Sequence, residues 1–138
     1  MLNFEMHATI KFNRPINSDV DYICPGGYSM TMAGKDVMFD FVEYKGNVDE
    51  DDATLLHVKQ RWLDEDVLEE SEYPITKSML SKVENISEFF VFTGYKNETD
   101  LKPISVESIT FVLPDDGNKE IHVKNDVLKS ASVCSELG

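Results

Sequence analysis

The stretch ISVESITFVLPDDGNKEIHVK, residues 104–124, decides the fold class of this chain. Its first ten residues alternate in polarity, which places Ile109, Phe111 and Leu113 on one side of an extended strand. The sequence PDDGN follows, and its Asp-Gly pair (residues 116–117) supplies the positive φ angles that a tight turn needs. We therefore predict an antiparallel hairpin that joins strands near 104–113 and 119–124.

Alternation of the same kind recurs elsewhere in the chain. Residues 4–12 carry an apolar side chain at every second position and predict an opening strand. Two further strands are expected at 28–33 and 36–44, and a short buried strand at 89–92. The sequence Pro25-Gly26-Gly27 is a strong breaker and predicts a turn after a short strand at 20–24.

The segment 54–63 fits two kinds of secondary structure. As a strand, it places Leu56, Val58 and Trp62 inward and the charged side chains between them outward. As a helix, it forms an apolar stripe that continues to Val67. The helix would leave the glutamates at 69–72 near its negative C-terminal end, at a cost of about 0.3–1 kcal/mol per charge. We therefore favour the strand.

Two helices complete the predicted fold. The clearer one begins near Pro74, because proline is favoured at a helix start and apolar residues follow it at helical spacing. Asn125 is a suitable cap for a short helix near the C-terminal end. We predict a single α+β domain over residues 1–138. It consists of a mainly antiparallel β-sheet, in one layer or two, with one clear helix at about 75–85 and the short C-terminal helix.

The composition is that of a folded protein, with 41% hydrophobic residues. No apolar run approaches the ~20 residues of a membrane span, and the N-terminal stretch does not have the pattern of a signal peptide. Cys24 and Cys134 lie far apart and outside any CxxC pair, which favours two reduced thiols over a single disulfide. We therefore predict a cytoplasmic protein that does not bind a membrane.

Acidic side chains concentrate in one segment of the chain. Between Glu43 and Glu72 lie eleven carboxylates, opposed by three basic residues, so this segment carries −8 of the net charge of −13. Clustered carboxylates repel nucleic-acid phosphates and attract a basic protein groove. The alternative is a solvated surface that only keeps the protein soluble. The predicted partner-binding residues are Asp49, Glu50, Asp51, Asp52, Asp64, Glu65, Asp66, Glu69, Glu70 and Glu72.

The sequence contains no recognisable motif for catalysis or cofactor binding. His7, His57 and His122 show no metal-ligand spacing and are interpreted as surface residues. The run from Asp49 to Asp52 lacks the spaced ligands and the central glycine of a calcium loop. No glycine-rich phosphate loop and no nucleophile motif occurs. We assign no catalytic residue, no metal ligand and no cofactor.

Three classes of function fit these observations. The leading hypothesis is a small non-enzymatic protein that binds and inhibits a basic, nucleic-acid-handling protein, as phage anti-defence proteins (CRISPR nuclease inhibitors among them) and immunity proteins do. The second is a small-ligand-binding or enzymatic domain whose site is assembled from dispersed residues. The third is a structural or assembly protein with an adhesive sheet edge. A continuous acidic ridge would favour the first class, a deep pocket with convergent polar groups the second, and a symmetric apolar patch the third.

Overall fold

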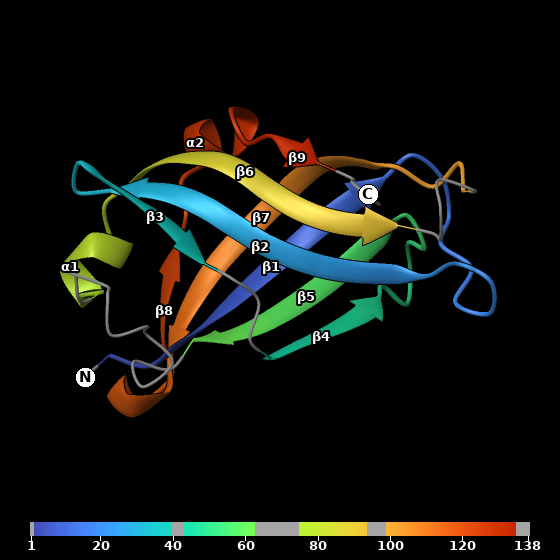
Figure 1. Ribbon diagram of the computed structural model, residues 1–138. Helices are drawn as coiled ribbons and strands as arrows, with labels where there is room; N and C mark the ends of the chain where they lie inside the picture. The colour runs from blue at the N-terminus through green and yellow to red at the C-terminus, as the bar shows by residue number, and fades with distance from the viewer. Residues whose placement is uncertain (1, 40–42, 63–74, 94–98, 135–138) are drawn as a thin grey trace.

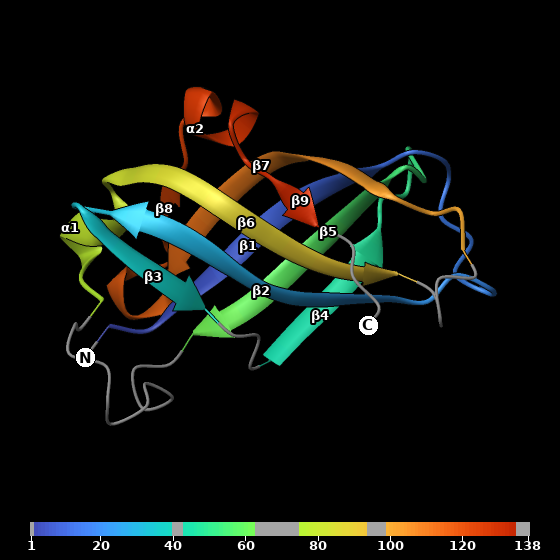
Figure 2. The same ribbon diagram turned by 45° about the horizontal axis from the view of Figure 1, so that its top comes forward.

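The computed structural model describes residues 2–39, 43–62, 75–93 and 99–134. Within these ranges the chain forms two β-sheets that lie face to face as two layers (Figure 1). The five-stranded sheet has the order β4-β5-β1-β7-β8, and the four-stranded sheet has the order β3-β2-β6-β9. The strands of one layer cross those of the other, and two short helices lie at the margins of the sheets (Figures 1 and 2).

The elements of the described part of the chain follow one another in this order: β1 (Phe4–Phe12), β2 (Ile23–Met32), β3 (Lys35–Phe39), β4 (Glu43–Val48), β5 (Leu55–Trp62), α1 (Lys77–Leu80), β6 (Val83–Thr93), β7 (Pro103–Leu113), β8 (Lys119–His122), α2 (Asn125–Lys129) and β9 (Val133–Cys134). The mainly antiparallel fold predicted from the sequence is confirmed, and it has two layers. Among these elements, no helix is long and apolar enough to cross a membrane.

β1 is the central strand of the five-stranded sheet. It pairs antiparallel with β5 on one side and with β7 on the other. Its burial alternates without a break, because the apolar side chains at every second position face the second layer. The opening strand predicted at residues 4–12 is therefore confirmed with the same bounds.

β2 and β6 form the middle of the four-stranded sheet. They pair antiparallel with three shifts of register along their length, and β9 pairs with β6 in the parallel direction. At Gly26, an added Cβ would meet Phe92 Cε2 at 2.7 Å and Phe90 Cβ at 2.9 Å. Glycine therefore allows the two strands to approach this closely, because it has no side chain.

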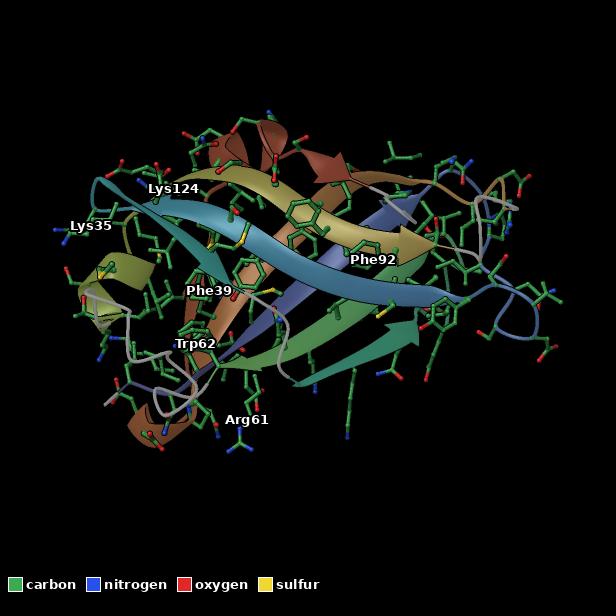
Figure 3. The ribbon with its side chains drawn as sticks, in the orientation of Figure 1. Lys35, Phe39, Arg61, Trp62, Phe92 and Lys124 are labelled. Carbon is green, nitrogen blue, oxygen red and sulfur yellow. The ribbon has the colours of Figure 1, made fainter. Side chains whose placement is uncertain are left out.

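The core lies between the two layers. Phe4 is fully buried, and its ring meets those of Phe39 and Phe111 edge-on, with centroids 6.0 and 5.7 Å away. Figure 3 shows Trp62 beside Phe39, while Arg61 points away from both layers; the Trp62 and Phe39 ring centroids are 5.1 Å apart. Ring pairs of this kind add about 0.5–1.5 kcal/mol each beyond the burial of their surface.

The hairpin predicted from residues 104–124 is confirmed. β7 and β8 pair antiparallel, with Leu113 opposite Lys119. The connection is longer than a two-residue turn, because Pro114–Asp116 first forms a 3-10 turn. The positive φ angles therefore fall on Gly117 (64°) and Asn118 (60°), one residue later than the Asp-Gly pattern predicts.

Within the ambiguous segment 54–63, residues 55–62 form strand β5, as favoured from the sequence, and residue 63 lies outside the described part of the chain. β5 buries Leu56 and Val58 and exposes His57, Lys59 and Arg61. It pairs with β1 on one side and with β4 on the other, so its backbone groups are satisfied by neighbouring strands rather than by a helix.

The prediction of one clear helix at about 75–85 is wrong. α1 contains four residues, and β6 has already begun at Val83. Thr76 caps this short helix by accepting a hydrogen bond from Met79 N, and the turn buries Met79 and Leu80. Helix propensity is weak over so short a segment. Pairing of Val83 and Ile86 with β2 outweighs it, because the ladder buries both strands' apolar side chains.

The short C-terminal helix is present as α2, and it buries Val127 and Leu128. Its cap differs from the prediction. Lys124 occupies the N-cap position without a side-chain hydrogen bond, and Asn125 is the first helical residue. Burial of the two apolar side chains therefore holds this helix in place rather than capping by Asn125.

One predicted turn and one predicted continuous strand are also wrong. Pro25-Gly26-Gly27 does not turn; it runs through β2 at a shift of register, where an irregular pairing accommodates it. The strand predicted at 36–44 is divided, because β3 ends at Phe39 and β4 starts at Glu43 in the other sheet. Residues 40–42, between them, lie outside the described part of the chain.

Candidate functional site

The first acidic block, Asp49–Asp52, forms the turn between β4 and β5. Asp49 N donates a hydrogen bond to Leu55 O at 2.9 Å, and Leu55 N donates to Asp52 O at 3.1 Å. The backbone of the block therefore closes the β4–β5 hairpin at one end of the five-stranded sheet (Figure 2).

Asp49 stabilises this turn through its side chain. Its Oδ2 accepts from the backbone N of Asp51 at 3.0 Å and of Asp52 at 2.9 Å, and its Oδ1 lies 2.6 Å from His57 Nε2. The bond to His57, followed by those to the two amides, holds the pKa of Asp49 below its usual range. This carboxylate is therefore engaged within the protein.

Asp52 has a similar structural role. Its Oδ1 accepts from Thr54 Oγ1 at 2.6 Å and from Thr54 N at 2.9 Å. These two bonds lower the pKa of Asp52. Glu50 and Asp51, in contrast, are exposed. Within the first block, they are the carboxylates most accessible to a partner.

The second block of predicted residues lies outside the described part of the chain: Asp64, Glu65, Asp66, Glu69, Glu70 and Glu72. The chain leaves β5 at Trp62, whereas the Asp49–Asp52 turn precedes that strand at Leu55. The eight residues of β5 span seven intervals of about 3.3 Å, so roughly 23 Å separates these two ends. β5 thus stands between the first block and the point where the second acidic segment begins.

All three histidines lie on the outer face of the five-stranded sheet, which we name the histidine face. His7 is on β1, His57 on β5 and His122 on β8. His7 Nε2 lies 2.8 Å from Glu5 Oε2, and His122 Nε2 lies 3.3 Å from Glu120 Oε2. With the His57–Asp49 pair, each histidine therefore has a carboxylate neighbour. Their side chains are 32%, 46% and 70% exposed, so the interpretation as surface residues is confirmed.

Two of these histidines also contact a threonine hydroxyl. Thr9 Oγ1 lies 3.0 Å from His57 Nδ1, and Thr110 Oγ1 lies 3.0 Å from His122 Nδ1. Each set forms a chain of hydroxyl, imidazole and carboxylate. In enzymes, such a chain allows a base to activate a hydroxyl nucleophile.

The surroundings of Thr9 favour binding over acyl transfer. β1 is the central strand, so its backbone amides are engaged in ladders with β5 and β7. They are therefore not available to form an oxyanion hole, which is usually the largest contribution to acyl-transfer catalysis. The polar side chains, by contrast, are directed outward from the sheet.

A shallow hollow of about 300 Å³ lies on the histidine face, at the lower end of the volumes of small-molecule sites. Its polar lining includes His7, Thr9, His57, Lys59, Ser108 and Thr110. A second hollow, of about 490 Å³, lies where the start of β6 meets the segment between β8 and α2. Lysines and carboxylates both line the second hollow, so its charges favour neither an anionic nor a cationic ligand. In the ranges that the structure describes, no group of three or more His, Cys, Asp or Glu side chains could hold a metal ion.

Sequence reasoning missed the histidine face as a site. Its members come from β1, β5, β7 and β8, and only the register of these strands brings them together. The available signal was that each histidine occupies an outward position on a predicted strand. That signal predicts that each histidine side chain points away from the core. It does not predict which residues lie beside it.

The fold and the site define a two-layer, mainly antiparallel β protein with an acidic turn and a polar histidine face. Comparison with known proteins gives no relative: no protein family, no curated protein and no solved structure matches the chain.

Proposed function

We propose that this protein binds a basic, nucleic-acid-handling protein through its acidic segment and inhibits it without catalysis of its own. The observation that carries the proposal is the local excess of charge, since −8 of the net −13 lies between Glu43 and Glu72. Such an array accelerates encounter with a basic groove and competes with phosphates for it. Phage anti-defence proteins, CRISPR nuclease inhibitors among them, and immunity proteins are the classes that this mode of action resembles.

The β4–β5 turn supports this proposal through its rigidity. Asp49 and Asp52 fix the backbone of the turn, and Glu50 and Asp51 are exposed between them. A turn that is ordered before binding loses little conformational entropy when a partner docks. The two engaged carboxylates therefore act as supports, and the two exposed ones are the proposed contacts in this block.

The proposal places the protein in the cytoplasm, where thiols stay reduced. The backbone of Cys24 lies opposite Phe92 and that of Cys134 opposite Phe90, on the two sides of β6. Two strand spacings, about 9.6 Å in total, exceed the upper limit of about 6.8 Å between the Cα atoms of a disulfide. Both cysteines should therefore react with a thiol reagent in the unfolded, unreduced protein. Detection of no thiol would contradict this placement.

The test of partner binding compares two variants with the same net charge. One neutralises Asp64, Glu65, Asp66, Glu69 and Glu70 together, as Asn or Gln. The matched control neutralises five exposed carboxylates elsewhere: Asp19, Glu88, Glu107, Asp115 and Asp126. The partner is first captured from the native host at low salt and identified after release at high salt, and it should be basic and bind nucleic acid.

The association rate with the purified partner is then measured at two ionic strengths. Neutralising the acidic segment should lower the rate by about tenfold or more and flatten its salt dependence, whereas the control should retain most of the rate. Equal rates for the two variants would show that the segment is only a solvated surface.

Small-ligand binding is a second candidate function, and the hollow on the histidine face favours it. Assembly through an apolar surface has less support. Four large apolar side chains of the described residues are markedly exposed, and they lie on three separate segments: Val20 and Tyr22 before β2, Met38 on β3 and Ile104 on β7.

A further inference from the structure

A row of basic groups crosses the histidine face. The strand register places Lys45 of β4 opposite Lys59 of β5, and Lys59 opposite His7 of β1. Like charges directly opposite one another on a sheet are destabilising. The two lysines are neighbours even though the chain has 26 acidic residues against 13 basic ones. Their juxtaposition therefore favours an anion beside them.

Hydroxyl groups adjoin this row. Thr110 lies opposite His7, and Thr9 lies between His57 on β5 and Ser108 on β7. The hollow of about 300 Å³ is lined by these hydroxyls, by both imidazoles and by Lys59. Lys59 Nζ and Ser108 Oγ are donor groups on this concave surface. The Thr9 hydroxyl is bonded to His57 and the Thr110 hydroxyl to His122, so these groups shape the hollow rather than add donors. A ligand with two or more acceptor oxygens can bond to both donors together.

We propose that this hollow binds a small oxyanion, the phosphate or carboxylate group of a small molecule, with Lys59 as its main charge partner. The bound anion would offset the repulsion between Lys45 and Lys59. The site is distinct from the acidic segment, and it does not depend on the proposed binding of a basic protein. The ligand class follows from the donors and from the sign of the charge on Lys59.

Three carboxylates near the hollow are bonded to histidines: Glu5 to His7, Asp49 to His57 and Glu120 to His122. They orient the imidazole rings. Glu120 also lines the hollow, so its charge opposes an anion there. The proposal therefore requires opposite effects from two neutral substitutions: Lys59→Gln must weaken binding and Glu120→Gln must strengthen it. A cation site would reverse both signs.

The experiment titrates the isotope-labelled full chain with sodium phosphate or sodium succinate, and with sodium chloride at matched ionic strength. Amide chemical shifts are followed by NMR. Saturable shifts should be confined to β1, β5, β7 and β8 around the hollow, and chloride should not produce them. Saturation by phosphate alone, or by succinate alone, identifies the oxyanion. Shifts that do not saturate with either salt, or that chloride reproduces, overturn the proposal.

Four variants then test the assignment of Lys59 and Glu120. Lys59→Gln should weaken binding about two- to fivefold, and Glu120→Gln should tighten it by a similar factor, as expected for exposed charges. The controls are Lys35→Gln, on the β2–β3 hairpin of the other sheet (Figure 3), and Glu88→Gln on β6. They make the same charge changes and should leave the dissociation constant unchanged. The amide spectrum of each variant reports whether it is folded, and equal affinities for all four folded variants refute the site.

Discussion

The two sheets of this protein differ in how regularly their strands pair. The more regular sheet presents polar side chains that could bind a ligand, and in the less regular sheet two strands pack closely together. In the five-stranded sheet, β1 pairs with β5 without a shift of register and with β7 through two shifts that both follow Thr9. Its burial alternates along its whole length, and it presents ordered rows of polar side chains on its outer face. In the four-stranded sheet, β2 pairs with β6 through three shifts of register and presses Gly26 against aromatic side chains. A regular strand places side chains from distant parts of the chain side by side. An irregular pair instead fits two backbones closely together.

The largest expected effect comes from the core that the two sheets share. Phe4→Ala should lower the free energy of unfolding by about 3–5 kcal/mol, because it leaves a cavity beside three aromatic rings. Phe89→Ala, in the four-stranded sheet, removes a ring that has one ring partner, Tyr28, among the described residues, and should cost less within the same range. Urea unfolding of both variants measures the difference. A larger loss for Phe89→Ala would contradict the greater contribution expected from the rings around Phe4.

Gly26→Ala tests the irregular sheet directly. The added Cβ would overlap Phe90 Cβ at 2.9 Å, an atom held close to the backbone, so we expect a loss of about 1–3 kcal/mol. Gly34→Ala is the matched control: it has open space around it but a φ of +75°, and should cost about 1 kcal/mol from backbone strain alone. Equal losses would mean that β6 moves to accommodate the methyl group, and that the close approach is not a packing constraint.

Acid should weaken the connection between the two layers. Asp21 and Arg14 lie in the segment between β1 and β2, where the nearly buried Asp21 carboxylate accepts two hydrogen bonds from Arg14, each of 2.9 Å. These bonds lower the pKa of Asp21. A lowered pKa in the folded state contributes stability above the unfolded value of about 3.9, and this contribution is lost as the pH falls through the folded value.

The free energy of unfolding should therefore fall between pH 5 and pH 2, and Asp21→Asn should reduce that fall. Asp19→Asn, two residues away and exposed, is the control. Urea unfolding across this pH range measures both variants. An unchanged pH dependence in Asp21→Asn would show that the Arg14 contact contributes little.

The smallest effect on stability is expected at the tip of the β4–β5 turn. Neutralising Glu50 and Asp51 together, as Gln and Asn, should leave the midpoint of urea unfolding unchanged, because both side chains are exposed. Neutralising Asp49 and Asp52 together should lower that midpoint, because their hydrogen bonds shape the turn. If both double variants behave alike, the division into supporting and contacting carboxylates is wrong.

Elements that depend on neighbouring residues are predictable from this sequence, whereas elements that depend on distant partners are not. The strand at 4–12, the strand within 54–63 and the hairpin at 104–124 were predicted correctly, because a period of two with one buried face is visible in a short window. The helix at 75–85 failed because β6 pairs with β2, a strand more than fifty residues away. Local propensity contains no information about such a partner.

The candidate sites divide in the same way. The concentration of carboxylates between residues 43 and 72 can be read from the sequence alone, since charge is a property of composition. The support that Asp49 and Asp52 give to the turn, and the row of Lys45, Lys59 and His7, arise from the folded chain. Hydrogen-bond geometry and cross-strand register depend on positions in space. Sequence spacing does not specify them, because antiparallel pairing joins residues whose separation along the chain is set by the loops between them.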